Sequence, residues 1–256
     1  MGAIAAAVYD FKEVAGWKLV MDFNGPKNFL NITDYMGVYM RDNVCAISFA
    51  GTDDVFDVVS ELNVATVPLC GFRSVHRGFA EKLERILRTH TWQTELAPYL
   101  RSGACAEGVV CVGHSLGGAL ASILAACANS QESGGIGHLL GGLAVAGIYT
   151  FGAPAVSKGQ LTDGRSSDGC FGGGRWYRED EAAFDPVPYL AHPLGFQHPR
   201  SIAIRMEDTG HGRAKREFEC ASREARDEPS TLKTPSIGYH ALSSYLAIAS
   251  SIYGPD

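Results

Sequence analysis

The sequence lacks the features that mark several specialised classes of protein. It has no collagen-like or solenoid repeat, and charged residues make up only 20% of its 256 residues, against 46% hydrophobic residues. This composition excludes an intrinsically disordered chain, which has low hydrophobicity and high charge. Basic residues are the minority charge, since 22 Lys and Arg face 28 Asp and Glu, for a net charge of −6. Nucleic acid is therefore excluded as the main partner, because binding phosphates requires an excess of basic side chains.

Long apolar runs are scarce as well. The stretch at 138–156 is long enough to span a membrane, but glycines, Tyr149 and Pro154 interrupt it. We predict a loop, a buried strand and a turn there, and no transmembrane segment. The first residues lack the basic segment and the longer apolar core of a secretory signal. The sequence predicts a soluble protein and leaves its compartment open, either cytoplasmic or secreted if a signal has been removed. It indicates no oligomeric state.

The seven cysteines contain no C-x-x-C pair, which argues against a zinc or redox motif, so we expect no metal site. Cys111 and Cys127 lie in apolar runs, where a thiol packs as a small hydrophobic side chain. The remaining pattern leaves room for one or two disulfides among Cys70, Cys105, Cys170 and Cys220.

Strands and helices alternate along the chain, with no linker between them. The predicted strands cover 38–40, 44–50, 109–112, 143–151, 175–178 and 202–205, and the predicted helices cover 3–15, 79–90, 116–128 and 239–252. Strands separated by helices form a mostly parallel sheet covered on both faces. Polar, Gly-rich or charged segments at 159–175 and 207–236 predict surface loops. We expect a single α/β domain over residues 1–256.

A G-x-S-x-G sequence, from Gly113 to Gly117, lies between a predicted strand and a predicted helix. In this context the motif forms a sharp turn that presents the serine hydroxyl at its apex, which predicts Ser115 as a nucleophile. The start of the following helix directs the Leu116 N–H toward the position of an oxyanion. His114 is expected to point away from Ser115, because neighbouring side chains of a strand alternate.

A serine nucleophile needs a base and an acid that orients the base. His240 follows the last predicted strand and precedes the terminal helix, which is where doubly wound hydrolases carry the base. The acid must fall between these two residues in the chain. Asp185 is favoured because the prolines at 186 and 188 fix its loop, and Asp180 is the rival. Two further aspartates, Asp163 and Asp168, lie in the Gly-rich segment, where carboxylates usually belong to exposed turns.

Further motifs accompany these residues in a recognisable order. They are Ala5-Ala6-Ala7-Val8-Tyr9, Ile47-Ser48-Phe49-Ala50-Gly51-Thr52, Val75-His76-Arg77-Gly78-Phe79, Tyr149-Thr150-Phe151-Gly152-Ala153-Pro154, Gly195-Phe196-Gln197-His198 and Tyr239-His240-Ala241-Leu242-Ser243-Ser244-Tyr245-Leu246. Together with the serine motif and the Asp185 loop, they make nearly the whole chain resemble a class 3, fungal-type lipase of the α/β-hydrolase superfamily. The resemblance implies the α/β-hydrolase fold, with a central, mostly parallel sheet flanked by helices and a short helical lid.

The resemblance also implies residue roles. It adds Thr52, whose N–H and hydroxyl would join the Leu116 N–H in an oxyanion hole, and it assigns His76 and His198 to structure. The segment at about 53–72 occupies the place of the family's lid. Its apolar side chains follow helical spacing, so it either packs permanently on the core or covers the serine in water and turns to lipid at an interface. These side chains are Val55, Phe56, Val58, Val59 and Leu62.

The implied function is hydrolysis of carboxylic esters, with a triacylglycerol lipase as the leading interpretation. The substrate would be a lipid ester, met at a lipid–water interface, and the chemistry requires no cofactor. A carboxylesterase, phospholipase or feruloyl-type esterase would use the same residues. A non-catalytic, lipase-like scaffold that binds a partner is a further alternative, against which the intact serine, aspartate and histidine set argues.

Overall fold

A central sheet organises the molecule. The computed structural model describes residues 1–24, 35–52, 65–132, 134–208, 213–218, 220 and 233–253. Within these residues the sheet has eight strands in the order β1-β2-β3-β6-β7-β8-β10-β11. Neighbouring strands from β3 to β10 are parallel, and antiparallel pairs occur only at the two edges. The mostly parallel sheet predicted from the sequence is confirmed.

The strands keep the order expected of alternating strands and helices. The central sheet consists of β1 (Lys18–Asn24), β2 (Tyr35–Arg41), β3 (Val44–Phe49), β6 (Gly108–His114), β7 (Gly147–Phe151), β8 (Phe171–Arg178), β10 (Ser201–Glu207) and β11 (Arg213–Phe218). Two small sheets pair β4 (Thr66–Leu69) with β5 (Phe72–His76), and β9 (Ala183–Phe184) with β12 (Thr234–Pro235).

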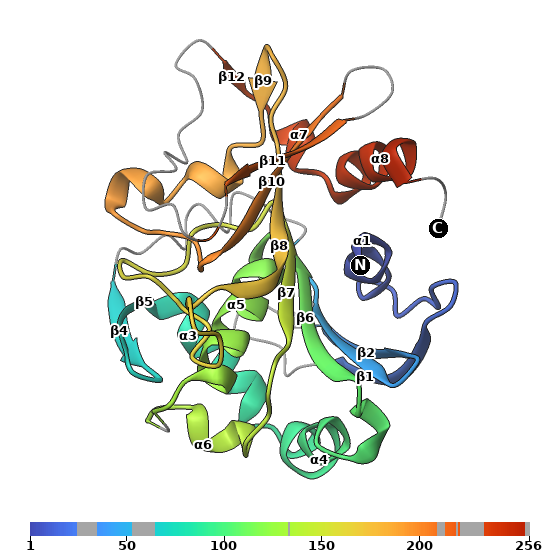
Figure 1. Ribbon diagram of the computed structural model, residues 1–256, viewed down its shortest axis with the longest axis vertical. Helices are drawn as coiled ribbons and strands as arrows, with labels where there is room; N and C mark the ends of the chain where they lie inside the picture. The colour runs from blue at the N-terminus through green and yellow to red at the C-terminus, as the bar shows by residue number, and fades with distance from the viewer. Residues whose placement is uncertain are drawn as a thin grey trace.

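Helices cover both faces of the sheet. They are α1 (Gly2–Ala7), α3 (Arg77–Leu87), α4 (Ala97–Leu100), α5 (Leu116–Asn129), α6 (Gly137–Leu140), α7 (Ile237–His240) and α8 (Leu242–Tyr253). Figure 1 shows α3 and α5 on one side of the sheet, with α1 and α8 on the other. Each side has its own group of buried apolar side chains. Among the described residues, no helix is long and apolar enough to cross a membrane.

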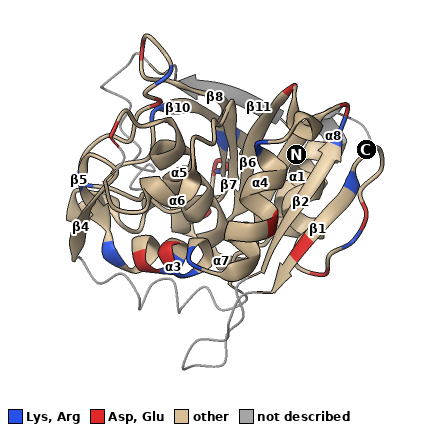
Figure 2. Ribbon diagram, turned by 90° about the horizontal axis from the view of Figure 1, so that it is seen from below, with Lys and Arg blue, Asp and Glu red and all other residues tan. Residues whose placement is uncertain are grey.

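The two helices on the first face differ because their sequences differ. α3 is amphipathic: it buries Phe79, Leu83 and Ile86, while basic and acidic residues also occur along it (Figure 2). α5 is built almost entirely of small and apolar residues and is buried nearly all round. A Cβ on Gly117 would lie 2.1 Å from the main-chain oxygen of Phe49, so α5 can approach the end of β3 only with glycine at this position.

The Gly-rich segment departs from the prediction of a surface loop. Gly172 and Gly173 lie inside strand β8, paired with Gly147 and Ile148 of β7. A Cβ would lie 2.7 Å from the Ala146 oxygen at the first position and 2.2 Å from the Ile148 oxygen at the second. The loop prediction for 171–175 is therefore wrong. Glycine serves here to bring two strands close together, a use that composition cannot distinguish from a flexible loop.

Several element boundaries also differ. The first helix ends at Ala7 instead of residue 15, and β7 begins at Gly147 instead of residue 143. The terminal helix is divided at Ala241, whose φ of −56° and ψ of 129° are not helical. Strands β11 and β12 occupy parts of the predicted 207–236 loop. Within the predicted lid range, residues 66–69 form β4, whereas 53–64 lie outside the described residues.

Three disulfides link the chain, and two of them correct the expected pairing. Cys45 bonds to Cys105, Cys70 to Cys127 and Cys170 to Cys220. Cys127 is therefore half of a disulfide and not a buried thiol, and Cys45 was not among the expected partners. Cys111 is buried and free, as expected. An apolar sequence around a cysteine predicts its burial, but not whether a second sulfur lies beside it.

Candidate active site

The nucleophile candidate occupies a strained turn. β6 ends at His114 and α5 begins at Leu116, so Ser115 alone makes the turn between strand and helix. Its φ of 54° and ψ of −129° are rarely adopted by residues other than glycine. Hydrogen bonds hold this conformation: the Ser115 N–H donates to the Phe151 oxygen over 2.9 Å, and the Ser115 carbonyl accepts from the Gly118 N–H over 2.9 Å. The strand–turn–helix context expected of the G-x-S-x-G motif is present.

Ser115, His240 and Asp185 form one hydrogen-bonded chain. His240 Nε2 lies 2.8 Å from Ser115 Oγ. On the other side of the ring, Nδ1 lies 2.9 Å from Oδ2 and 3.1 Å from Oδ1 of Asp185. An aspartate on Nδ1 fixes the tautomer in which Nδ1 carries the hydrogen and Nε2 accepts from the serine hydroxyl. The three side chains come from the turn after β6, the loop after β9 and the end of α7.

The carboxylate of Asp185 is held by further donors. The Val187 N–H donates to Oδ1 over 2.9 Å, and the Tyr245 hydroxyl donates to Oδ2 over 2.6 Å. Tyr245 in turn accepts from the Arg178 N–H. Burial, followed by the nearby Asp185 charge, raises the pKa of Tyr245 well above its ordinary value, so the hydroxyl stays protonated and donating. Tyr245 received no role in the sequence analysis, because nothing in a helical sequence indicates a partner 60 residues away.

The other aspartates lie in different networks. Asp163 accepts from Asn129 Nδ2 over 2.8 Å, and Asp168 caps the turn at Ser166 and Cys170. Asp180, the rival candidate, accepts from the Asp208 N–H and forms an ion pair with Arg178. Of the four candidates, the structure places Asp185 beside His240.

The oxyanion candidates flank the serine. Thr52 follows β3, and the position of Gly51 is tight: a Cβ there would lie 3.0 Å from Ser115 Cβ and 2.8 Å from the His114 oxygen. Leu116 is the first residue of α5, where N–H groups have no partner within the helix. The chain segments that carry Thr52 and Leu116 therefore meet beside Ser115. The lid candidates Val55, Phe56, Val58, Val59 and Leu62 lie outside the described residues.

His114 packs against His240, a contact that the sequence did not predict. Its ring stacks on that of His240, with centroids 4.7 Å apart, and its Nε2 lies 2.7 Å from the His240 main-chain oxygen. Burial, aided by the nearby His240, lowers the pKa of His114 to about 3.

The two histidines assigned to structure are buried away from the triad candidates. His76 caps α3, its Nδ1 accepting from the Phe79 N–H, and it stacks on the Phe79 ring. His198 Nε2 lies 2.9 Å from the Pro188 oxygen. Burial lowers the pKa of His76 to about 4 and that of His198 well below its ordinary value.

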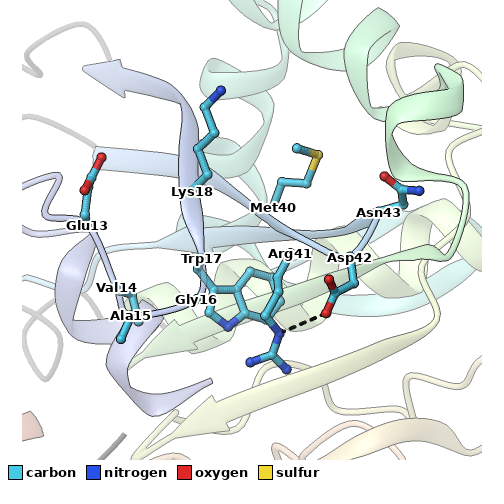
Figure 3. A pocket seen from close by; sticks show the side chains of 10 residues that line it. All are labelled: Glu13, Val14, Ala15, Gly16, Trp17, Lys18, Met40, Arg41, Asp42 and Asn43. Carbon is cyan, nitrogen blue, oxygen red and sulfur yellow. Dashed lines mark ion pairs between the residues drawn. The ribbon is translucent and has the colours of Figure 1, made fainter.

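A pocket of about 570 Å³ opens elsewhere on the surface, between the segment before β1 and the β2–β3 turn. Figure 3 shows Arg41 extended toward Trp17, with a dashed ion pair to Asp42. Its lining mixes Glu13, Lys18, Arg41 and Asp42, and it contains none of the site residues. The pocket is therefore separate from Ser115, His240 and Asp185.

Comparison with known proteins agrees with the fold. Residues 46–167, which include Thr52, Ser115 and Leu116, match the family of lipase (class 3). A comparison with curated protein sequences finds no significant match.

Solved structures of fungal lipases share the architecture. Lipase II from Rhizopus niveus is 20% identical, with a TM-score of 0.63, covering 93% of this chain and 89% of its own. A triacylglycerol lipase whose catalytic centre is a serine protease triad is 18% identical, with a TM-score of 0.64 and the same coverage, 93% and 89%. The propeptide complex of Rhizomucor miehei lipase is 20% identical, with a TM-score of 0.62, covering 88% of this chain and 68% of that one. Residues 46–167 are therefore similar to the lipase (class 3) family, and the chain shares the α/β-hydrolase fold of these solved lipases.

Proposed function

We propose that the protein is a serine hydrolase of carboxylic esters, with acylglycerols as its substrates. Ser115 is the nucleophile, His240 the general base and Asp185 the acid that orients it. The observation that carries this proposal is the continuous hydrogen-bonded chain from Ser115 Oγ through His240 to Asp185. A serine protease triad forms the catalytic centre of one triacylglycerol lipase of similar fold, which supports the same use here.

The reaction follows from the direction of these hydrogen bonds. Ser115 Oγ attacks the ester carbonyl while its proton passes to His240 Nε2, and Asp185 stabilises the imidazolium. The collapse of the tetrahedral intermediate breaks the ester C–O bond, and the Nε2 proton leaves with the alcohol. Water then attacks the acyl-enzyme, loses a proton to Nε2 and releases the carboxylic acid together with regenerated Ser115. No cofactor enters these steps.

The negative charge on the intermediate needs donors beside Ser115. Thr52 and the Leu116 N–H are the proposed donors, because the end of β3 and the first turn of α5 meet at the serine. The loss of one such donor typically costs about 3 kcal/mol of transition-state stabilisation. The site draws on residues from Thr52 to His240, which supports a single domain.

Burial of the site bears on the class of substrate. Ser115 and Asp185 are 0% exposed and His240 is 1% exposed, so an ester reaches Ser115 only after the surrounding protein opens. An opening driven by lipid would make the rate jump as the ester concentration passes its solubility limit. Smooth saturation would instead indicate a soluble carboxylesterase. Rates on phospholipids and aryl esters separate the phospholipase and feruloyl-type alternatives.

The nucleophile is tested with a fluorophosphonate probe. The wild-type protein should be labelled once per chain and Ser115→Ala should not, and labelling that survives the substitution contradicts the proposal. Asp185→Asn and Asp180→Asn form a matched pair for the acid. We expect the first to lower kcat by about 10⁴-fold and the second to leave it largely intact. The reverse result would move the acid to Asp180, and a well-folded wild type inert toward short p-nitrophenyl esters would revive the scaffold alternative.

A further inference from the structure

A second chain of hydrogen bonds runs behind the triad candidates. The Tyr9 hydroxyl lies 2.9 Å from the Gly51 main-chain nitrogen and 3.1 Å from His114 Nδ1. His114 Nε2 lies 2.7 Å from the main-chain oxygen of His240. Four separate segments of the polypeptide contribute groups to it: the turn after α1, the turn after β3, the end of β6 and the end of α7.

The donor or acceptor role of each atom in this hydrogen-bonded chain can be assigned. A carbonyl oxygen can only accept, so His114 Nε2 carries a hydrogen and donates it to His240. His114 is neutral in its buried position and has one ring hydrogen, so Nδ1 is an acceptor. The Tyr9 hydroxyl therefore donates to Nδ1, and its oxygen accepts the Gly51 N–H. The bonds all run in compatible directions, which makes the chain fully satisfied.

One end of this hydrogen-bonded chain lies beside the proposed oxyanion donor, and the other end lies at the proposed base. Gly51 precedes Thr52, the proposed oxyanion donor, and His240 is the proposed base. Tyr9 and His114 thus connect the main chain beside the oxyanion to the main chain of the base, without contacting Ser115 Oγ. Catalysis requires both groups to lie at fixed distances from the reacting carbon.

We propose that Tyr9 and His114 are positioning residues that hold the Gly51–Thr52 turn and the His240 main chain at fixed positions relative to each other, on either side of Ser115. This role rests on the proposed ester hydrolysis. Breaking the chain should let the donor and the base shift independently, which weakens the transition state and leaves the binding of the acyl chain unaffected. The predicted signature is a loss in kcat with little change in KM.

Tyr9→Phe is the first test, with Tyr99→Phe as its matched control. Tyr99, in α4, also has a partly buried hydroxyl, which donates to the sulfur of Met40 in β2. We expect Tyr9→Phe to lower kcat by about 10- to 100-fold, the usual range when buried partners lose a hydrogen bond, with KM changed less than about twofold. Tyr99→Phe should behave as wild type. Titration of active sites with the fluorophosphonate corrects for any misfolded fraction.

His114→Gln and His114→Leu form the second test. Glutamine can still donate to the His240 oxygen, whereas leucine fills similar space and leaves that oxygen without its donor. We expect His114→Gln to recover at least about tenfold of the kcat lost in His114→Leu, a rescue that simple packing would not produce. Tyr9→Phe combined with His114→Leu should cost little more than His114→Leu alone, because both break one chain.

Failure of the proposed function can be distinguished from failure of the positioning role alone. Wild-type protein that hydrolyses no ester, or activity that survives Ser115→Ala, overturns the proposed function. Normal wild-type hydrolysis with unchanged kcat in Tyr9→Phe, equal kcat in the two His114 variants, or multiplicative losses in the double variant overturns the positioning role alone.

Discussion

The hydroxyl of Tyr245 donates a 2.6 Å hydrogen bond to Oδ2 of Asp185, so the carboxylate is fixed by a side chain as well as by the main chain. Tyr245 comes from α8, the helix that follows His240, and its ring is buried. One helix turn therefore ties the proposed acid to the segment that carries His240. This arrangement makes Tyr245 part of the support for the triad candidates.

Tyr245→Phe should lower kcat by about tenfold, because the carboxylate loses one donor and becomes free to rotate away from His240 Nδ1. Steady-state rates on a short ester measure the effect. Tyr189→Phe is the comparison, since it removes a similar hydroxyl–carboxylate bond, to Glu179. Equal losses in the two variants would show that Tyr245 has no special connection to the site.

Gly152 is predicted to be intolerant of any side chain. Its φ is 57°, and a Cβ there would lie 2.8 Å from Asp185 Oδ2 and 3.1 Å from His240 Nδ1. Gly152→Ala should abolish most activity by pushing Asp185 and His240 apart. Gly142→Ala is the control for backbone strain, because Gly142 has a φ of 81° but no atom within 4 Å of an added Cβ. The prediction is wrong if both variants keep wild-type rates after correction for folding.

The disulfides should contribute strongly to stability. Cys45–Cys105 and Cys70–Cys127 close loops of 60 and 57 residues, and a cross-link of this length stabilises a fold by about 4 kcal/mol in the chain-entropy description. Replacing either pair by serine should lower the free energy of unfolding in urea accordingly. Cys111→Ala removes a buried thiol without breaking a link and should cost less. A larger loss from Cys111→Ala would contradict the pairing.

Stability should fall in mild acid because of three buried histidines. The pKa is lowered to about 4 for His76 and about 3 for His114, and lies well below its ordinary value for His198, chiefly through burial. Unfolding restores each histidine pKa to near 6.5, so the unfolded chain binds more protons from about pH 6.5 down to about pH 4 for His76 and about pH 3 for His114. Stability is complete above this window and decreases as the pH falls through it, by about 2 kcal/mol at pH 5 for His76 and for His114. His198 adds a loss in the same direction.

Urea unfolding at pH 8 and pH 5 measures this loss. His198→Gln should reduce the difference between the two pH values, because glutamine keeps an N–H for the Pro188 oxygen and does not titrate. A difference identical to that of wild type would show that His198 is not the source of the effect.

The sequence was most informative where chemistry needs neighbouring residues. The sharp turn at Ser115 follows from five consecutive positions, and the prolines after Asp185 singled out its loop among four aspartates. Those predictions depend on local geometry, which short motifs encode. The triad and oxyanion roles themselves stay proposals until the substitutions are made.

Contacts between distant segments could not be predicted in the same way. Tyr9 and His114 are 105 residues apart, and each lies in a segment whose own pattern is explained by packing. Cys127 looked like a core thiol because its apolar neighbours are the same with or without a disulfide. The glycines of β8 resembled a loop because composition does not record how closely two strands approach. In each case the missing information was the identity of the neighbour in space.

The conformation of Ser115 has a consequence for the whole molecule. A φ of 54° with a ψ of −129° costs a residue with a Cβ roughly 1–3 kcal/mol, a cost that glycine avoids. Ser115→Gly should therefore unfold at a higher urea concentration than Ser115→Ala, although both lack the hydroxyl. The difference between these two inactive proteins measures the folding stability that is given up so that one reactive oxygen can stand at the tip of the turn.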